Sequence, residues 1–173
     1  MNFKERLTHI KAFAFDVDGV LSPNCIPLHI TGEPLRMVNI KDGYAIHFAI
    51  KKQYPIAIIT GGKSESVRIR FADLGVQDIY LGAHRKTKEF FEFLEKHQLT
   101  ADQVLYVGDD IPDYEVMKLA GIAVAPADAA PQIKSIAHYV SDKNGGEGCG
   151  RDVIEQVLTA QGIWMSDEQA FGW

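Results

Sequence analysis

Two aspartates separated by one residue, Asp16 and Asp18, follow an apolar run and precede Gly19. In an extended segment, side chains two residues apart lie on the same side. One carboxylate of such a pair can attack a phosphorus atom and form an acyl phosphate, while the other carboxyl group protonates the leaving oxygen. The spacing therefore fits a nucleophile at Asp16 and a general acid and base at Asp18.

Groups that could bind phosphoryl oxygens follow further along the chain. Thr60 offers a hydroxyl group, and the Gly61-Gly62 backbone after it can approach a phosphate closely, with amides that lead into a helix N-terminus. Lys86 supplies a fixed positive charge. Phosphoryl transfer needs hydrogen-bond donors and cations of this kind. Each motif alone is often only a turn or a helix cap, but their joint order favours phosphate chemistry.

A second acidic run, GDDIPD, occupies residues 108–113. If Asp109 and Asp113 lie near Asp16 and Asp18, these carboxylates repel one another, because two unit charges roughly 4 Å apart interact by about 4 kcal/mol at an effective dielectric constant of about 20. Such a cluster needs a cation or a proton. Oxygen ligands beside a phosphate favour Mg²⁺, and no histidine adjoins the acidic motifs to favour zinc. We therefore expect Mg²⁺ as the cofactor.

The elements that must position these groups are predicted to be short buried strands that alternate with amphipathic helices. This alternation predicts an α/β fold, a Rossmann-like doubly wound parallel sheet in a single domain of residues 1–173. The motifs would then meet at the carboxyl edge of the sheet, where ligands bind in such folds. The expected strands are residues 12–17, 56–60, 78–81, 104–108, 121–124 and 138–140.

Two segments depart from the alternation. Residues 26–40 read as a β-hairpin insertion around Thr31-Gly32-Glu33, and residues 141–173 form a C-terminal tail and helix. Ser64 and Asp128 are expected to cap helices. The intervals between Asp18, Thr60 and Lys86 are too short for a lid of ordinary domain size, so no cap domain is expected.

Composition narrows the classes of function. The 173 residues carry a formal net charge of −5 without a basic stripe, which argues against nucleic-acid binding. The two cysteines, Cys25 and Cys149, form no metal-binding motif, as expected for a reducing, cytoplasmic protein. The charged N-terminal segment is not expected to be a signal peptide, and no stretch is apolar enough to suggest a membrane span.

The four motifs together resemble those of the haloacid dehalogenase superfamily of phosphotransferases. Asp16–Gly19 resembles its first motif, Thr60 its second, Lys86 its third and Gly108–Asp113 its fourth. A narrower resemblance, to the 3-deoxy-D-manno-octulosonate 8-phosphate phosphatases, rests on segments that include Asp42-Gly43-Tyr44 and Gly145–Gly148 with Arg151. That family belongs to the capless branch, forms tetramers and serves lipopolysaccharide biosynthesis.

The resemblance implies roles for individual residues. Asp16 would be the nucleophile, and Asp18 the general acid and base. The metal would be bound by Asp16, Asp109 and the backbone carbonyl of Asp18. Residues Asp110 and Asp113 would orient that shell, while Thr60, Gly61 and Lys86 would hold the phosphoryl group. Three arginines are weaker candidates for binding the sugar: Arg68, Arg70 and Arg151.

Several alternatives stay open at this stage. A receiver-type signalling domain also combines acidic residues, threonine and lysine around Mg²⁺, but its phosphorylated aspartate lies on a later strand. A subunit that has lost activity would keep the fold alone. Another sugar acid phosphate, such as a nine-carbon 2-keto-3-deoxy sugar 9-phosphate, is a further alternative as substrate. Residues 145–151 either reach toward a neighbouring subunit's site or form a flexible connector, and residues 163–173 match no motif.

Overall fold

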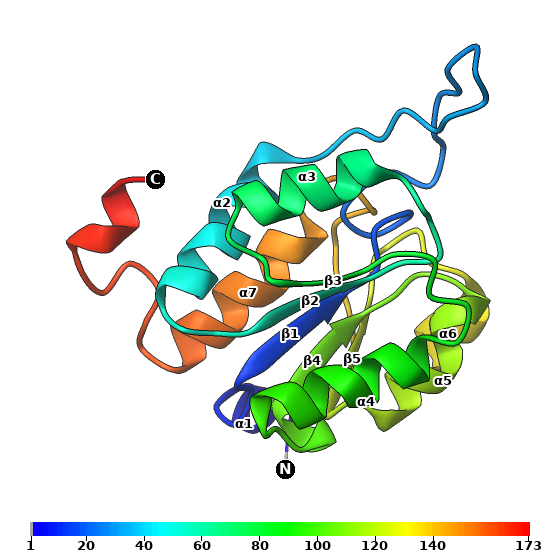
Figure 1. Ribbon diagram of the computed structural model, residues 1–173. Coiled ribbons are helices and arrows are strands. Elements are labelled where there is room, and N and C mark those ends of the chain that lie inside the picture. Colours follow the sequence, from blue (N-terminus) through cyan, green and yellow to red (C-terminus); the bar gives the residue numbers. More distant parts are fainter. Residues whose placement is uncertain (1) are drawn as a thin grey trace.

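The computed structural model describes residues 2–173, in which six parallel strands form one sheet. The strand order is β3-β2-β1-β4-β5-β6, and the chain crosses from one half of the sheet to the other after β3 (Figure 1). This arrangement confirms the predicted doubly wound α/β fold without a cap domain. The strands are β1 (Ala12–Phe15), β2 (Ile56–Ile59), β3 (Asp78–Tyr80), β4 (Val104–Val107), β5 (Ile122–Ala125) and β6 (Tyr139–Val140).

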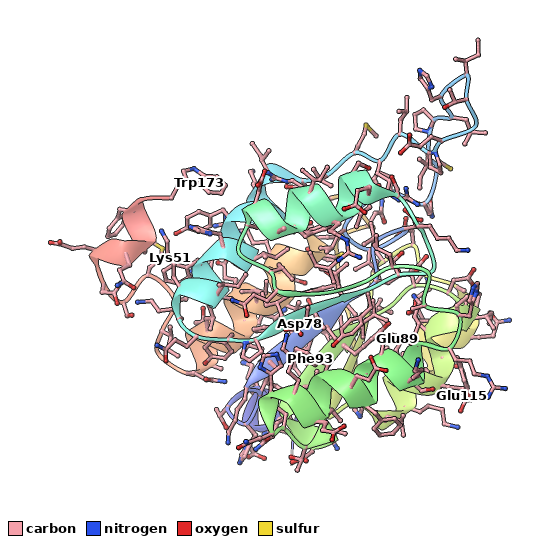
Figure 2. The ribbon with its side chains drawn as sticks, viewed as in Figure 1. Lys51, Asp78, Glu89, Phe93, Glu115 and Trp173 are labelled. Carbon is pink, nitrogen blue, oxygen red and sulfur yellow. The ribbon has the colours of Figure 1, made fainter. Side chains whose placement is uncertain are left out.

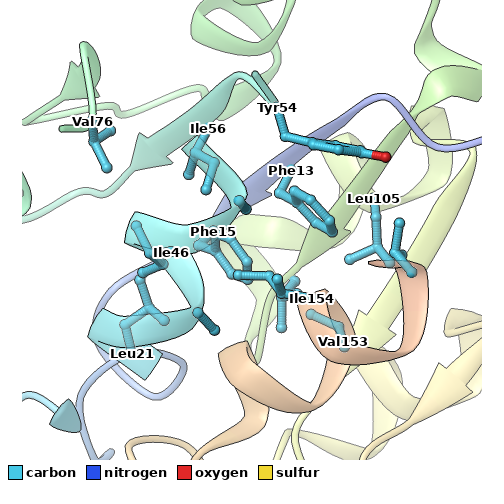
Figure 3. Packing of buried hydrophobic residues seen from close by; sticks show 14 of the residues in the cluster. Phe13, Phe15, Leu21, Ile46, Tyr54, Ile56, Val76, Leu105, Val153 and Ile154 are labelled. Atoms are coloured by element: carbon cyan, nitrogen blue, oxygen red, sulfur yellow. The ribbon is translucent and has the colours of Figure 1, made fainter. Parts of the chain in front are cut away.

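Helices cover both faces of the sheet, because the central strands are apolar on both faces. Phe13 and Phe15 of β1 pack on the face covered by α2, α3 and α7, and Figure 3 shows part of this cluster. Ala12 and Ala14 pack on the opposite face, against α4, α5 and α6. The helices are α1 (Phe3–Leu7), α2 (Ile40–Lys51), α3 (Glu65–Asp73), α4 (Lys86–His97), α5 (Tyr114–Leu119), α6 (Pro131–Ile136) and α7 (Cys149–Ala160).

The register of the sheet brings the sequence motifs to one edge. Strand β1 lies between β2 and β4, with Phe15 opposite both Ile58 and Val107. The residues that follow these three strands therefore emerge side by side at the carboxyl edge of the sheet. Among them are Asp16 after β1 and Thr60 after β2.

The hairpin insertion has less regular structure than its sequence suggests. One isolated antiparallel bridge, between Leu28 and Pro34, joins the two arms in place of a ladder of paired residues. The loop projects beyond the body of the molecule, beside the N-terminal end of α3 (Figure 1). Apolar side chains on it face solvent, with Ile30 97% exposed. Ser64 stands at the N-cap of α3, but its hydroxyl donates to Glu33 of the hairpin rather than capping the helix.

The C-terminal segment docks on α2. A 3₁₀ turn, Glu168–Phe171, follows α7, and the Tyr44 hydroxyl donates to the carbonyl oxygen of Ala170. Trp164 meets Tyr44 edge to face, and Trp173 lies beside α2 (Figure 2). Residues 163–173 thus form a cover over one side of α2. Across residues 2–173, no helix has both the length and the apolar character needed to cross a lipid bilayer.

Candidate active site

Lys86, the first residue of α4, lies at the centre of the acidic groups. Its Nζ lies 2.9 Å from Asp16 Oδ2 and donates to Asp113 Oδ1 at 2.7 Å. The lysine side chain is buried. Although burial opposes it, the charges of Asp16 and Asp113 raise the pKa of Lys86, so this residue is a permanent cation at neutral pH.

Asp113 is held by donors on both of its carboxylate oxygens. Oδ1 accepts from Lys86 and from the Tyr106 hydroxyl at 2.8 Å, while Oδ2 accepts from the backbone amide of Asp109 at 3.2 Å. Tyr106 reaches Asp113 from β4, whereas Asp113 is the N-cap residue that precedes α5. With both oxygens occupied, Asp113 is suited to orienting Lys86 and the loop that carries Asp109.

Three carboxylates converge beside Lys86. One oxygen from each of Asp16, Asp109 and Asp113 lies within 4.8 Å of the others. Burial and the charge of Asp113 raise the pKa of Asp16 to about 7. Burial and the charges of Asp16 and Asp113 raise the pKa of Asp109 to about 8. Three carboxylates and one ammonium group leave a net charge of −2 when all are ionised, so the donor set fits a hard divalent cation.

Asp18, two residues after Asp16, pairs with Arg36, which comes from the hairpin. Arg36 Nε donates to Asp18 Oδ1 at 2.7 Å, and Nη2 donates to Oδ2 at 2.9 Å. The Asp18 side chain keeps 37% of its surface exposed, whereas that of Arg36 keeps 7%. An exposed carboxyl group next to the buried Asp16 is suited to exchanging a proton with a bound molecule.

The loop after β2 places its donors at the same edge. Thr60 is buried, and its Oγ1 accepts from the Gly62 amide at 3.2 Å. Its backbone is fixed on the neighbouring segment, because Thr60 N donates to Tyr80 O and Ala83 N donates to Thr60 O. The Thr60 hydroxyl hydrogen and the Gly61 amide therefore belong to a rigid loop that leads into α3.

Two glycines allow the loops around the cluster to pack closely. Gly19 has a φ of +83°, and a Cβ at this position would lie 2.0 Å from Asp109 Oδ2. A Cβ on Gly145 would lie 2.0 Å from the Gly19 carbonyl oxygen. Gly146 N donates to Val20 O, so residues 145 and 146 support the loop that follows Asp16. Residues 145 and 146 are therefore packed against this loop and are not a flexible connector, whereas the reach of residues 147–151 toward a neighbouring subunit stays a prediction.

Asp128 also differs from expectation. Helix α6 begins at Pro131 after Ala130, and Asp128 does not cap it. Instead, the Asp128 carboxylate accepts from the Gly145 amide at 2.9 Å and from Asn24 Nδ2 at 3.1 Å. It therefore ties the tail to the loop that follows the DVDG motif.

Within residues 2–173, the three arginines proposed for sugar binding make no hydrogen bond or ion pair with the carboxylate cluster. Arg68 is exposed on α3 and pairs with Glu65 at 3.4 Å. Arg70 packs against Gly43, where a Cβ would lie 2.8 Å from its Nη2. Arg151 lies over the rings of Tyr44 and Trp164 and pairs with Glu155. Asp110 is exposed and precedes the 3₁₀ turn Ile111–Asp113, which leads into α5.

Two residues of the site carry no motif in the sequence. Tyr106 could have been found, because a tyrosine inside a fully buried strand needs a partner for its hydroxyl group. Arg36 gives no comparable signal, since the hairpin arm has neither a regular period nor a recognisable spacing.

Comparison with known proteins adds independent findings. A family model described as haloacid dehalogenase-like hydrolase matches residues 64–151. The 3-deoxy-D-manno-octulosonate 8-phosphate phosphatase KdsC of Escherichia coli K12 is 42% identical over 154 residues, which cover 89% of this chain and 82% of that protein. The protein of the same name from Yersinia pestis is 38% identical over 157 residues, which cover 91% of this chain and 84% of that protein.

Solved structures agree in fold. That of the same phosphatase from Moraxella catarrhalis, in complex with magnesium ion, phosphate ion and a KDO molecule, superposes with a TM-score of 0.91 at 30% identity, covering 98% of this chain and 97% of that one. The cobalt-bound phosphatase YrbI of Haemophilus influenzae gives a TM-score of 0.90 at 32% identity, and the match covers 96% of this chain and 98% of that one.

Proposed function

Because the chain belongs to the haloacid dehalogenase-like hydrolases, we propose that it removes the phosphate from 3-deoxy-D-manno-octulosonate 8-phosphate. The observation that carries the chemistry is the placement of Lys86 between Asp16 and Asp113 at the carboxyl edge of the sheet. Similarity to relatives supports this substrate, because they are phosphatases named for this sugar phosphate and the structure of one of them contains a KDO molecule.

The reaction proceeds in two displacements at phosphorus. Asp16 attacks the phosphoryl group, the bond from phosphorus to the sugar oxygen breaks, and Asp18 gives a proton to that oxygen. Water then attacks the aspartyl phosphate, Asp18 takes a proton from it, and inorganic phosphate leaves with Asp16 restored. Lys86, the Thr60 hydroxyl and the Gly61 amide hold the phosphoryl oxygens during both steps.

Mg²⁺ is the metal that we propose for the carboxylates. Asp16, Asp109 and the backbone carbonyl of Asp18 would hold it, and Asp113 and Asp110 would support these ligands. When bound, the ion supplies positive charge that offsets repulsion between Asp16 and the phosphate. The donor set consists of oxygens alone, and burial together with neighbouring carboxylates raises the pKa values of Asp16 and Asp109, a repulsion that a bound cation would offset.

We also propose that the enzyme is a cytoplasmic homotetramer that serves lipopolysaccharide precursor synthesis. The hairpin supports self-association, because its apolar side chains are exposed on a projecting loop: Leu28, Ile30, Leu35 and Met37 are 48–97% exposed. A neighbouring subunit that covers this loop would also shield the open site, which no cap domain covers. Arg68, Arg70 and Arg151 would bind the sugar in such an assembly.

A panel of phosphate esters tests the proposed substrate. We expect kcat/KM to be highest for 3-deoxy-D-manno-octulosonate 8-phosphate, and lower for a nine-carbon 2-keto-3-deoxy sugar 9-phosphate and for p-nitrophenyl phosphate. A preference for the nine-carbon ester would overturn the substrate but not the chemistry. The variant Asp16→Asn should lose turnover on every ester, because an amide is a poor nucleophile, and normal turnover would refute the mechanism.

A further inference from the structure

The hairpin contributes a buried cation to the active site of its own subunit. Its return arm, residues 34–39, leads from the projecting tip back to α2 and carries Arg36. The guanidinium group uses Nε and Nη2 to grip both oxygens of Asp18, at 2.7 and 2.9 Å. This two-pronged geometry fixes the plane of the guanidinium group as well as its distance.

The same guanidinium group lies against the loop that binds the phosphoryl group. A Cβ on Gly62 would lie 2.7 Å from Arg36 Nη2 and 3.5 Å from Thr60 Oγ1. Arg36 therefore lies between the proposed proton donor, Asp18, and the phosphoryl-binding threonine. A phosphate ester that reacts here must place its leaving oxygen near Asp18 and its phosphoryl oxygens near Thr60.

One nitrogen of this buried group has no partner. Arg36 Nη1 is shielded from solvent and makes no hydrogen bond within residues 2–173. Only 7% of the surface of the Arg36 side chain is exposed. A buried donor on a charged group costs free energy when it is left unpaired. A contact that served only to anchor the hairpin would not need this spare donor beside the phosphoryl loop.

We infer that Arg36 is a substrate-contacting residue whose guanidinium group holds Asp18 with one edge and binds the phosphoryl group of the substrate with its remaining N–H groups. This inference rests on the proposed phosphatase chemistry, but it is independent of which sugar carries the phosphate. It gives the hairpin a role in catalysis within its own subunit, in addition to any role in assembly.

The first experiment measures the affinity of the Mg²⁺-loaded protein for inorganic phosphate by calorimetry, in wild type, Arg36→Met and Arg36→Lys. Methionine keeps much of the packing of the side chain and removes its donors. We expect Arg36→Met to weaken phosphate binding by about 10- to 100-fold, as for the loss of a hydrogen bond to a charged group, and Arg36→Lys to recover part of it. Unchanged phosphate affinity in Arg36→Met, with its circular dichroism and melting temperature preserved, would overturn the inference.

Steady-state kinetics separate a contact from a purely structural role. With p-nitrophenyl phosphate, loss of a substrate contact raises KM and weakens inhibition by phosphate, in addition to any fall in kcat from a displaced Asp18. A variant that lowers kcat alone would show that Arg36 only positions Asp18. As a control, Lys88→Ala removes an exposed cation from α4, 75% exposed at its side chain, and should change neither constant.

The outcomes distinguish failure of this inference from failure of the proposed function. If wild type hydrolyses p-nitrophenyl phosphate but not the sugar phosphate, the substrate is wrong and the test of Arg36 stands. If wild type hydrolyses neither ester, the phosphatase chemistry fails, and the calorimetric comparison still decides whether Arg36 binds phosphate. If Arg36→Met does not fold, Arg36→Lys and Arg36→Gln take its place in the calorimetric comparison. We expect Arg36→Lys to bind phosphate more tightly than Arg36→Gln, because lysine keeps the positive charge. Equal phosphate affinities of these two folded variants would refute the contact.

Discussion

Replacing Asp109 by asparagine should stabilise the protein in the absence of metal, although it removes a proposed metal ligand. Burial and two neighbouring carboxylates raise the pKa of Asp109 from 3.8 to about 8. The folded state therefore holds a proton that the unfolded chain releases, and stability falls as the pH rises from about 4 toward 8. An asparagine does not titrate, so it escapes this loss.

The size of the effect follows from the shift. Each pKa unit corresponds to about 1.4 kcal/mol, so a rise of about four units sets an upper bound of about 6 kcal/mol at pH 8. Asp109 is only partly buried, and solvent screening and local relaxation reduce this value. We expect a gain of about 1–2 kcal/mol for Asp109→Asn at pH 8 with chelator, and little gain at pH 4.

Urea denaturation at both pH values, with chelator and then with Mg²⁺, measures the effect. An ion that binds only the folded state adds about 2.7 kcal/mol at 100 times its Kd. Wild type should gain this stabilisation and Asp109→Asn should lose most of it, so the order of stability reverses when Mg²⁺ is added. The exposed control Asp142→Asn makes the same change in net charge and should show no reversal. If Asp109→Asn is less stable than wild type in chelator at pH 8, our account of the cluster is wrong.

Two other substitutions test the surroundings of the site. Gly19→Ala places a Cβ 2.0 Å from Asp109 Oδ2 at a φ of +83°. We therefore expect Mg²⁺-dependent activity to fall by at least about tenfold and the free energy of unfolding to fall by about 1 kcal/mol. Wild-type activity in this variant would show that the loop adjusts freely. Ile30→Asp alters a side chain that is 97% exposed, so it should leave the melting temperature unchanged but yield smaller particles in sedimentation velocity. The control Leu119→Asp, at an exposed position on α5, should sediment like wild type, and an unchanged assembly in Ile30→Asp would remove the hairpin from the proposed interface.

The predictable part of this structure is the part built from local patterns. Short runs rich in apolar and aromatic residues mark the strands, and parallel strands must end at a common edge, so the meeting of Asp16 with Asp109 follows from their positions after β1 and β4. The same reasoning places Thr60 and Lys86 at this edge.

The remainder depends on contacts between segments far apart in the chain. Arg36 reaches Asp18 from an irregular arm whose course no local pattern determines. Asp128 looks like a helix cap in the sequence, but its carboxylate satisfies the amide of Gly145, which lies 17 residues away. A glycine-rich stretch likewise suggests flexibility, whereas residues 145 and 146 use their lack of side chains to pack against the loop after β1.

The docked C-terminal segment determines what the protein's intrinsic fluorescence can report. The chain has two tryptophans, Trp164 and Trp173, and both lie against Tyr44 of α2. Tryptophan emission therefore follows the attachment of the last eleven residues to this helix. Arg151 lies over the Trp164 ring, so the same emission would also respond to a sugar bound by Arg151. Comparing substrate with inorganic phosphate, which has no sugar, separates that response from a movement of α2, which begins where the return arm carrying Arg36 ends.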